Sequence, residues 1–318
     1  MAGQFLEKHH PRFAIAVIGC LLMASGCRRN TPTNSSSQGV QPRVVSLVPA
    51  ASDLLEGMGV ADHLVAVSNY DIDPKLPSLP KVGDYLTTDW ERIAPLHPGL
   101  IITQYAQGRT PAGFAQRVQD LGATQLNLHI DRLEDIYAAG MELADAVKEH
   151  DRGAAAIALL KEQIESVRHA VAGEATVPTL IVVGPDGSSI AGPGSYLDDL
   201  LQAAGGKNAA QGMTAWPTID RERLASFQPQ VIIQLLSSSS PQVQQQAEFV
   251  WKSLPDVSAV KNGRVVRLSE WYAMEPGYQV GRLTRQFATI LHPDIKLPQS
   301  ITNPSTRQSL SADGVPAH

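Results

Sequence analysis

The segment from Asp89 to Ile102 constrains the fold of this chain most, because it recurs 131 residues later, from Asp220 to Ile233, with seven of fourteen positions identical. In each copy an aspartate suited to cap a helix precedes a short helical stretch, a proline and a run typical of a buried strand. A chain of 318 residues is long enough for two cores of ordinary size. We therefore predict two similar lobes; the alternative is one large sheet with a chance repeat.

The rest of the chain fits this division. Short apolar runs alternate with helical patterns in residues 43–131 and again in residues 174–297, which predicts an α/β fold with mainly parallel sheets covered by helices. Residues 132–173 form one alanine-rich helical stretch without proline, with a break predicted near Asp151–Gly153. We interpret this stretch as one long, rigid helical connector between an N-terminal and a C-terminal lobe.

Both ends of the chain differ from these lobes. Lys8 and Arg12 precede an uncharged run, residues 13–26, that is too short to span a membrane, so residues 1–26 are predicted to be a signal peptide. Ala24–Cys27 resembles the lipobox of bacterial lipoproteins, which predicts lipidation of Cys27; the alternative is an ordinary signal cut near Gly26. Residues 27–42 and 298–318 are polar and lack periodicity, and we expect a flexible tether and a disordered tail.

Composition and motifs argue against several functions. The net charge of −5 comes without clustered basic residues, so nucleic acid is not an expected partner. The histidines are scattered and Cys20 and Cys27 are the only cysteines, which disfavours a metal site. The sequence lacks a Gly-x-Ser-x-Gly elbow, and Ser195 is predicted to cap a helix. We predict a protein that is not an enzyme; an envelope enzyme of two lobes is the alternative.

Aromatic residues make up 5% of the chain, yet six of them fall in loops near predicted strand ends. In open α/β sheets such loops line the crevice where ligands bind, and aromatic side chains offer broad, stiff surfaces for a large ring-shaped ligand. The alternative is that each ring packs inside its own lobe; Trp251 is assigned to the core for that reason. The predicted cleft residues are Tyr70, Tyr85, Tyr105, Trp216, Trp271 and Tyr272.

Glu91 and Glu222 occupy equivalent positions in the two copies of the repeat, in the first turn of a predicted helix. A favourable interaction with the helix dipole explains a carboxylate at such a position. Matched carboxylates on two lobes also form a two-point site for a partner that carries matched arginines. The residues by themselves leave both interpretations open.

Three groups of residues resemble a known family: Pro42–Val60, the segment VAVSNYDIDP from Val65 to Pro74, and the paired repeats. They are similar to the substrate-binding proteins of ABC importers that capture cobalamin, haem and ferric siderophores, and the resemblance runs from about Arg43 to His292. It implies two Rossmann-like lobes joined by one rigid helix, with the ligand between them. It also implies that Glu91 and Glu222 bind arginines of a permease dimer with its ATPase subunits.

Within this family the chain resembles the cobalamin-binding branch. The resemblance implies ligand contacts for Tyr70, Trp216 and the segment Glu270-Trp271-Tyr272, whereas Tyr85 and Tyr105 stand where that branch has tryptophans, and Ala273-Met274 replaces a Glu-Arg pair. We expect a monomer without a cofactor, anchored by lipid to a membrane of the cell envelope, that binds a corrinoid and closes by a few degrees. The alternative is a haem receptor, with Tyr85 and Tyr105 as haem ligands, or a ferric-siderophore receptor of the same fold.

Overall fold

The computed structural model describes residues 41–76, 78–84 and 86–299, and all of these residues belong to one compact unit. The predicted signal peptide, Cys27, nearly all of the tether, Tyr85 and residues 300–318 lie outside the described residues. Within the described ranges, no helix combines the length and the apolar character needed to cross a membrane.

The N-terminal lobe contains a parallel sheet with the strand order β2-β1-β3-β4, as the alternating pattern predicts. The central strand β3 is buried at every residue, because helices cover both of its faces. The strands are β1 (Val44–Ser46), β2 (Leu64–Ala66), β3 (Leu100–Thr103) and β4 (Thr124–Asn127). The helices are α1 (Pro49–Gly57), η1 (Ala61–His63), α2 (Trp90–Ile93), η2 (Ala94–Leu96) and α3 (Phe114–Asp120).

The C-terminal lobe contains a mixed sheet with the order β6-β5-β8-β9, in which β7 pairs with the start of β5 and β6 is antiparallel. Strands β6 and β7 were not predicted, because neither lies in an extended apolar run like those that mark β1 and β2. The strands are β5 (Val177–Val183), β6 (Ser189–Ala191), β7 (Gly206–Asn208), β8 (Val231–Leu235) and β9 (Val265–Leu268). The helices are α6 (Tyr196–Ala203), α7 (Arg221–Ser226), α8 (Pro241–Lys252), α9 (Ser258–Lys261) and α10 (Val280–Leu291).

The connector is helical and interrupted, as predicted, but the break lies a few residues before Asp151–Gly153, where it was expected. It folds into two helices, α4 (Leu133–Ala146) and α5 (His150–Val171), and the chain turns between them at Lys148, whose φ is 64°. Gly153, where the break was expected, lies inside α5. A Cβ atom on Gly153 would lie 2.2 Å from the Cβ atom of Ala144 in α4. The glycine therefore allows the two helices to pack closely and does not interrupt α5.

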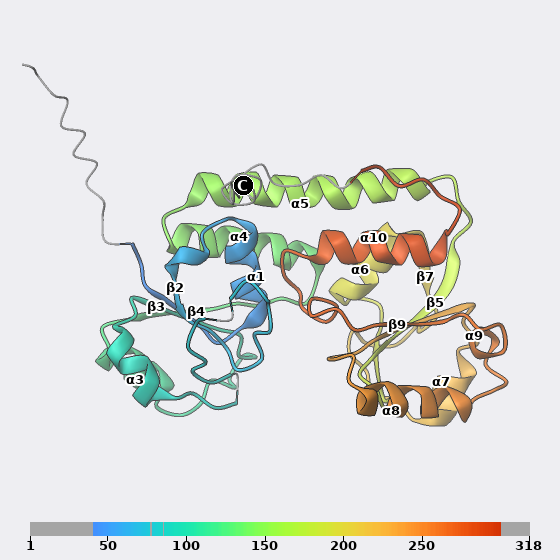
Figure 1. The fold of residues 1–318 in the computed structure, drawn as a ribbon, viewed down its shortest axis with the longest axis horizontal. Coiled ribbons are helices and arrows are strands. Elements are labelled where there is room, and N and C mark those ends of the chain that lie inside the picture. The colour runs from blue at the N-terminus through green and yellow to red at the C-terminus, as the bar shows by residue number, and fades with distance from the viewer. Residues whose placement is uncertain (1–40, 77, 85, 300–318) are drawn as a thin grey trace, which may run out of the picture. The chain divides into compact units, whose positions relative to one another are not determined.

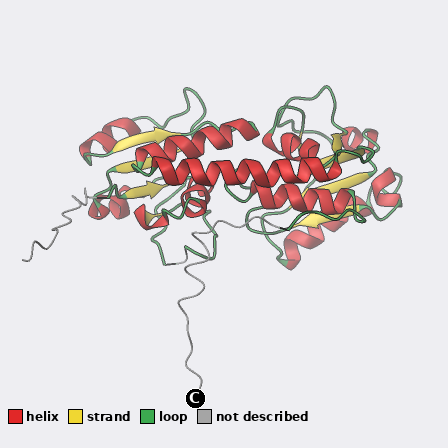
Figure 2. Cartoon of the chain, turned by 90° about the horizontal axis from the view of Figure 1, so that it is seen from above, coloured by secondary structure: helices red, strands yellow, loops and turns green. Residues whose placement is uncertain are grey.

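The connector joins the lobes, because α4 packs against α1 of the N-terminal lobe and against α5, and α5 packs against α6 and α10 of the C-terminal lobe (Figure 1). Viewed from above, the strands form two separate groups with long helices over and between them (Figure 2). Ile136 of α4, Leu160 of α5 and Phe287 of α10 are fully buried in one hydrophobic cluster that includes residues of both sheets. The helices thus bury a continuous apolar core between the lobes, which supports a rigid connector.

The repeated sequence folds into the same local unit in each lobe. Asp89 caps α2 by accepting a hydrogen bond from the backbone nitrogen of Arg92 at 3.1 Å, and Asp220 caps α7 by accepting one from Arg223 at 2.8 Å. The paired isoleucines that close each copy lie in β3 and β8 with no exposed surface. The predicted caps and buried strands are therefore confirmed.

Candidate functional site

The larger of two neighbouring cavities has a volume of about 590 Å³ and is lined by residues of both lobes. Most of its lining residues follow the carboxyl ends of strands β1, β2, β3, β8 and β9, which is where ligands bind in open α/β sheets. The N-terminal lobe contributes Leu47, Val48, Pro49, Asn69, Tyr70, Ile72 and Gln104, and the C-terminal lobe contributes Leu236, Ser237, Glu270, Trp271, Met274 and Glu275. We refer to this cavity as the cleft.

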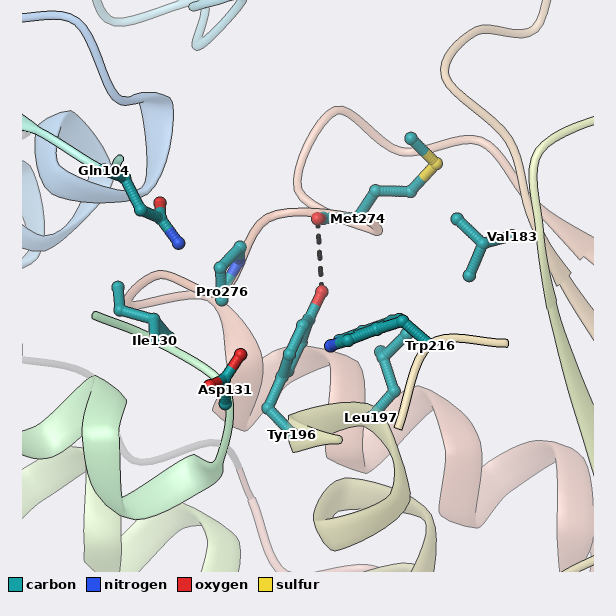
Figure 3. A pocket seen from close by; sticks show the side chains of 9 residues that line it. All are labelled: Gln104, Ile130, Asp131, Val183, Tyr196, Leu197, Trp216, Met274 and Pro276. Carbon is teal, nitrogen blue, oxygen red and sulfur yellow. Dashed lines mark hydrogen bonds between the residues drawn. The ribbon is translucent and has the colours of Figure 1, made fainter. Parts of the chain in front are cut away.

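A second cavity of about 320 Å³ shares Gln104 and Met274 with the cleft (Figure 3). The rings of Tyr196 and Trp216 lie side by side in its wall, with their centroids 5.8 Å apart. The Tyr196 hydroxyl donates a hydrogen bond to the carbonyl oxygen of Met274 at 3.1 Å. This bond fixes the segment that separates the two cavities, and we refer to the second cavity as the side pocket.

Three of the six predicted aromatic residues line these cavities. Tyr70 and Trp271 line the cleft, and Trp216 lines the side pocket. Tyr70 has 51% of its surface exposed and Trp216 has 44%, whereas Trp271 is half-buried. All three side chains lie in cavity walls, and aromatic residues are common in the walls of ligand-binding cavities, so their position favours a binding surface.

Tyr105 and Tyr272, which were also predicted to line the cleft, are not among the residues that line either cavity. Tyr105 is 6% exposed and its ring packs edge-on against Phe114, with centroids 5.3 Å apart. Tyr272 is 2% exposed, and the Arg282 guanidinium lies 4.8 Å from the centroid of its ring.

Gln104 lines the cleft, and the next residue, Tyr105, faces the lobe interior, as expected where side chains alternate at the end of a strand. Trp271 and Tyr272 lie in a turn after β9, in which Trp271 lines the cleft and Tyr272 is buried. The alternative considered from the sequence, that a ring packs inside its own lobe, thus holds for Tyr105 and Tyr272.

The polar groups of the cleft wall include two carboxylates. Glu270 accepts a hydrogen bond from Gln286 Nε2 at 2.8 Å, while its second oxygen is buried and has no partner among the described residues. Glu275 lines the same cavity, and Asp131 lines the side pocket. No lysine, arginine or histidine occurs among the described residues that line either cavity. The walls therefore combine aromatic and apolar surface with acidic groups and no base.

One group of residues has the spacing of a metal site. Asp53, Glu56 and Asp73 offer oxygen atoms that lie within 4.8 Å of one another. The Lys75 ammonium lies 2.5 Å from Glu56 Oε1, and Gln279 donates its backbone N–H to Asp53 at 3.0 Å. The protein thus already supplies an ammonium and an amide to these carboxylates.

Glu91 and Glu222 are both exposed in the first turns of α2 and α7. Neither carboxylate forms an ion pair with another described residue. The two side chains are therefore accessible to a partner. Ser195 caps α6 as predicted, and its hydroxyl accepts a hydrogen bond from the backbone nitrogen of Asp198 at 3.2 Å.

Several wall residues were not predicted from the sequence. Gln104 follows β3, and Leu236 follows β8, so the strand-end rule that selected the aromatic residues applies to them equally. Tyr196 and Glu275 carry no comparable local signal. They reach the cavities because α6 and the loop before α10 pack between the sheets.

Comparison with known proteins places this geometry in context. Residues 44–271 match the periplasmic binding protein family. An uncharacterised ABC transporter substrate-binding lipoprotein of Bacillus subtilis is 20% identical over 79% of this chain and 80% of its own length. The vitamin B12-binding protein of Vibrio cholerae is 24% identical over 82% of this chain and 93% of its own. A crystal structure of a periplasmic haem-binding protein from Pseudomonas aeruginosa superimposes with a TM-score of 0.70, at 21% identity, over 82% of this chain and 96% of its own.

Proposed function

The chain belongs to the periplasmic binding protein family, and from this premise we propose that it binds a corrinoid in the cleft and delivers it to the permease of an ABC importer. The family includes receptors for vitamin B12, for haem and for ferric siderophores, so the fold by itself does not select the ligand. The function is binding and release, without a catalysed reaction.

The character of the cavity walls is the observation that carries this proposal. A corrinoid is a broad ring whose side chains end in amides, and it needs flat apolar contact together with hydrogen-bonding groups for the amide edges. Trp271 and Trp216 supply aromatic surface, and Glu270 supplies a carboxylate in the cleft wall as an acceptor for amide N–H groups.

The same walls disfavour haem. The two propionates of haem are anionic, and burying a carboxylate next to acidic groups without a basic partner is costly. The described wall residues include the acidic residues Glu270 and Asp131 but no base. One observation favours the alternative of an iron-containing ligand: Tyr70 presents an exposed phenol to the cleft, and tyrosine ligates ferric iron in some haem proteins.

The partner and the anchor are part of the proposal. Glu91 and Glu222 bind arginines of the permease dimer, one on each lobe, because both carboxylates are exposed and have no ion-pair partner among the described residues. The lipid on Cys27 holds the protein, as a monomer, at a membrane of the cell envelope. The permease acts together with ATPase subunits.

Ligand identification tests the proposal directly. We expect mass spectrometry of the purified full-length protein to find a corrinoid among the co-purifying small molecules, and calorimetric titration with cyanocobalamin to give saturable binding. A titration with haemin provides the matched comparison, because tyrosine ligation of its iron changes the visible absorbance spectrum. Saturable haemin binding with that spectral change, together with no response to cyanocobalamin, would replace the corrinoid by haem.

A further inference from the structure

The loop before α10 joins the C-terminal lobe to helix α1 of the N-terminal lobe. Asp53 of α1 is 1% exposed and accepts two hydrogen bonds from Gln279, one from the backbone nitrogen at 3.0 Å and one from Nε2 at 3.4 Å. A Cβ atom on Gly277 would lie 2.3 Å from Asp53 Oδ2. Glycine at this position allows the loop backbone to lie directly on the buried carboxyl group.

Glu275 belongs to the same loop and lines the cleft. Among the described residues, none donates a hydrogen bond to its carboxylate. The charge of Glu275 interacts with that of Asp53 across the contact between the lobes, and with that of Asp71. The loop therefore connects a group in the cleft wall with a buried group that faces it from the other lobe.

The surroundings of these two acids are rich in negative charge. Two lysines lie near them, but Lys75 binds Glu56 at 2.5 Å and Lys81 donates to the backbone oxygen of Asp71, so neither forms an ion pair with Asp53 or Glu275. The other titratable groups that face Asp53 are Glu56, Asp73 and Tyr278, and those that face Glu275 are Asp71 and Tyr196. Ionisation of both Asp53 and Glu275 thus places two adjacent negative charges between the lobes.

This environment favours the uncharged acids. Burial is the main cause that raises the pKa of Asp53 to about 7, against the opposing hydrogen bonds from Gln279, and the charges of Asp73 and Glu56 add to it. Burial also raises the pKa of Glu275 to about 7, with further contributions from Asp53 and Asp71. Near neutral pH each of the two acids therefore holds its proton part of the time, and the charge of Asp53 adds to the cost of ionising Glu275.

We propose that Asp53 and Glu275 form a proton-binding pair in which Glu275 selects the ligand, by donating a hydrogen bond from its uncharged carboxyl group to a carbonyl oxygen of the ligand. This inference rests on the proposed function, since it assigns Glu275 to the same cleft. Amide side chains of a corrinoid present such carbonyl oxygens. When the pair ionises, Glu275 loses its donor and repels Asp53, so the cleft holds the ligand less tightly.

The coupling has a definite direction. The ligand binds the protonated pair in preference, so affinity is highest below about pH 6 and falls as pH rises through about 7. For one linked proton the dissociation constant rises by at most about tenfold per pH unit. Binding near neutral pH takes up protons from the buffer.

The test is a calorimetric titration of the full-length protein with cyanocobalamin from about pH 5.5 to about pH 8.5, in buffers of different ionisation enthalpy. We expect weaker binding at higher pH and proton uptake near pH 7. Glu275→Gln keeps the shape and a donor but cannot ionise, so its affinity is expected to be independent of pH. Glu162→Gln changes an exposed glutamate of α5 and serves as the matched control that keeps the wild-type profile.

Two results overturn the proposal. Either the affinity of the unmodified protein does not depend on pH, or the affinity of Glu275→Gln depends on pH in the same way as that of the unmodified protein.

Infrared spectroscopy of the ligand-free protein distinguishes failure of this proposal from failure of the proposed function. If cyanocobalamin does not bind at any pH, the corrinoid assignment is wrong. The protonation of Asp53 and Glu275 is then tested separately, by the infrared band of the uncharged carboxylic acid. That band is expected to disappear as pH rises through about 7, and Asp53→Asn and Glu275→Gln are each expected to diminish it. A band unaffected by both substitutions excludes the pair.

Discussion

His97 and Gln228, which lie 131 positions apart at equivalent points of the repeat, adopt the same left-handed backbone conformation, with φ angles of 45° and 42°. Each residue precedes a buried proline and turns the chain from the helical segment into the central strand of its lobe. Residues other than glycine adopt this conformation at a cost. The repeat therefore preserves a costly turn as well as a sequence pattern, which indicates that both lobes need the same entry into the strand.

Replacing His97 by glycine is expected to stabilise the protein by about 0.5 kcal/mol or more, because glycine adopts positive φ without strain. Gln228→Gly provides the contrast. The Gln228 side chain donates to the carbonyl oxygen of Ala225 at 2.9 Å and accepts from the backbone nitrogen and the hydroxyl of Ser258 at 3.1 and 2.9 Å. Loss of these hydrogen bonds in Gln228→Gly is expected to destabilise the protein. Urea unfolding measures both changes, and a stability change of the same sign in both variants would contradict this account.

Gly153→Ala is expected to lower the free energy of unfolding by about 1 to 3 kcal/mol, although alanine favours helices more than glycine does. The added methyl group meets Ala144 of α4 at 2.2 Å, so α4 and α5 must move apart. Thermal unfolding measures the loss. The double variant Gly153→Ala with Ala144→Gly restores the space and is expected to recover most of the stability; no recovery would show that the contact is not the cause.

Trp271→Ala is expected to weaken ligand binding by about tenfold or more, which corresponds to about 1.4 kcal/mol, because it removes aromatic surface from the cleft wall. Tyr105→Leu is the matched control, since the same sequence pattern selects Tyr105 but its ring packs inside the N-terminal lobe. This variant is expected to lose stability and keep its affinity. Calorimetric titration measures the ligand affinity of both variants. Equal effects of the two substitutions on affinity would exclude Trp271 as a ligand contact in the cleft.

Glu91→Ala combined with Glu222→Ala is expected to abolish most ligand uptake by whole cells while leaving ligand affinity unchanged, because both carboxylates are exposed in α2 and α7 and line neither cavity. Glu162→Ala, an exposed substitution on α5, is the control for general loss of surface charge. Uptake at the normal rate by the double variant would remove both residues from the docking proposal.

Asp53→Asn is expected to change how stability depends on pH. The pKa of Asp53 is raised by burial from 3.8 to about 7, so the folded protein binds this proton more tightly than the unfolded chain does. The contribution of Asp53 to the free energy of unfolding is therefore fully present below about pH 4. It falls by up to about 1.4 kcal/mol per pH unit as pH rises to about 7.

Asparagine cannot ionise, so the variant is expected to lose this part of the pH dependence and to gain stability relative to the unmodified protein as pH rises from about 5 to about 8. Urea unfolding at several pH values measures the difference. Asp256→Asn replaces an exposed aspartate and is expected to leave the profile unchanged. A pH dependence that is identical in Asp53→Asn and in the unmodified protein would show that Asp53 does not retain its proton.

Much of the architecture was predictable from the sequence because its signals are local. A capping aspartate, a few helical residues and a β-branched run specify a helix and a strand by contacts within about ten residues, and the repetition of that unit predicted two lobes. The strand-end rule then located the cleft, since the carboxyl ends of parallel strands lie on one edge of a sheet. These inferences needed no knowledge of which segments meet.

Tertiary structure decided the features that depend on contacts between distant segments. Trp271 lines the cleft and Tyr272 is buried because of how the turn after β9 packs against the rest of the lobe. Gly153 looks like a helix break in the sequence, yet it permits the close approach of α4 and α5.

The sequence by itself thus determined the two-lobed fold, the position of the cleft at the strand ends and the family. Only the folded chain brings Asp53 into contact with Gln279, which is 226 residues away. Folding also buries the carboxyl groups of Asp53 and Glu275, and this burial determines whether they are charged. The physical reason is that secondary structure depends on near neighbours, whereas the electrostatic environment of a carboxyl group depends on every segment that excludes water from it.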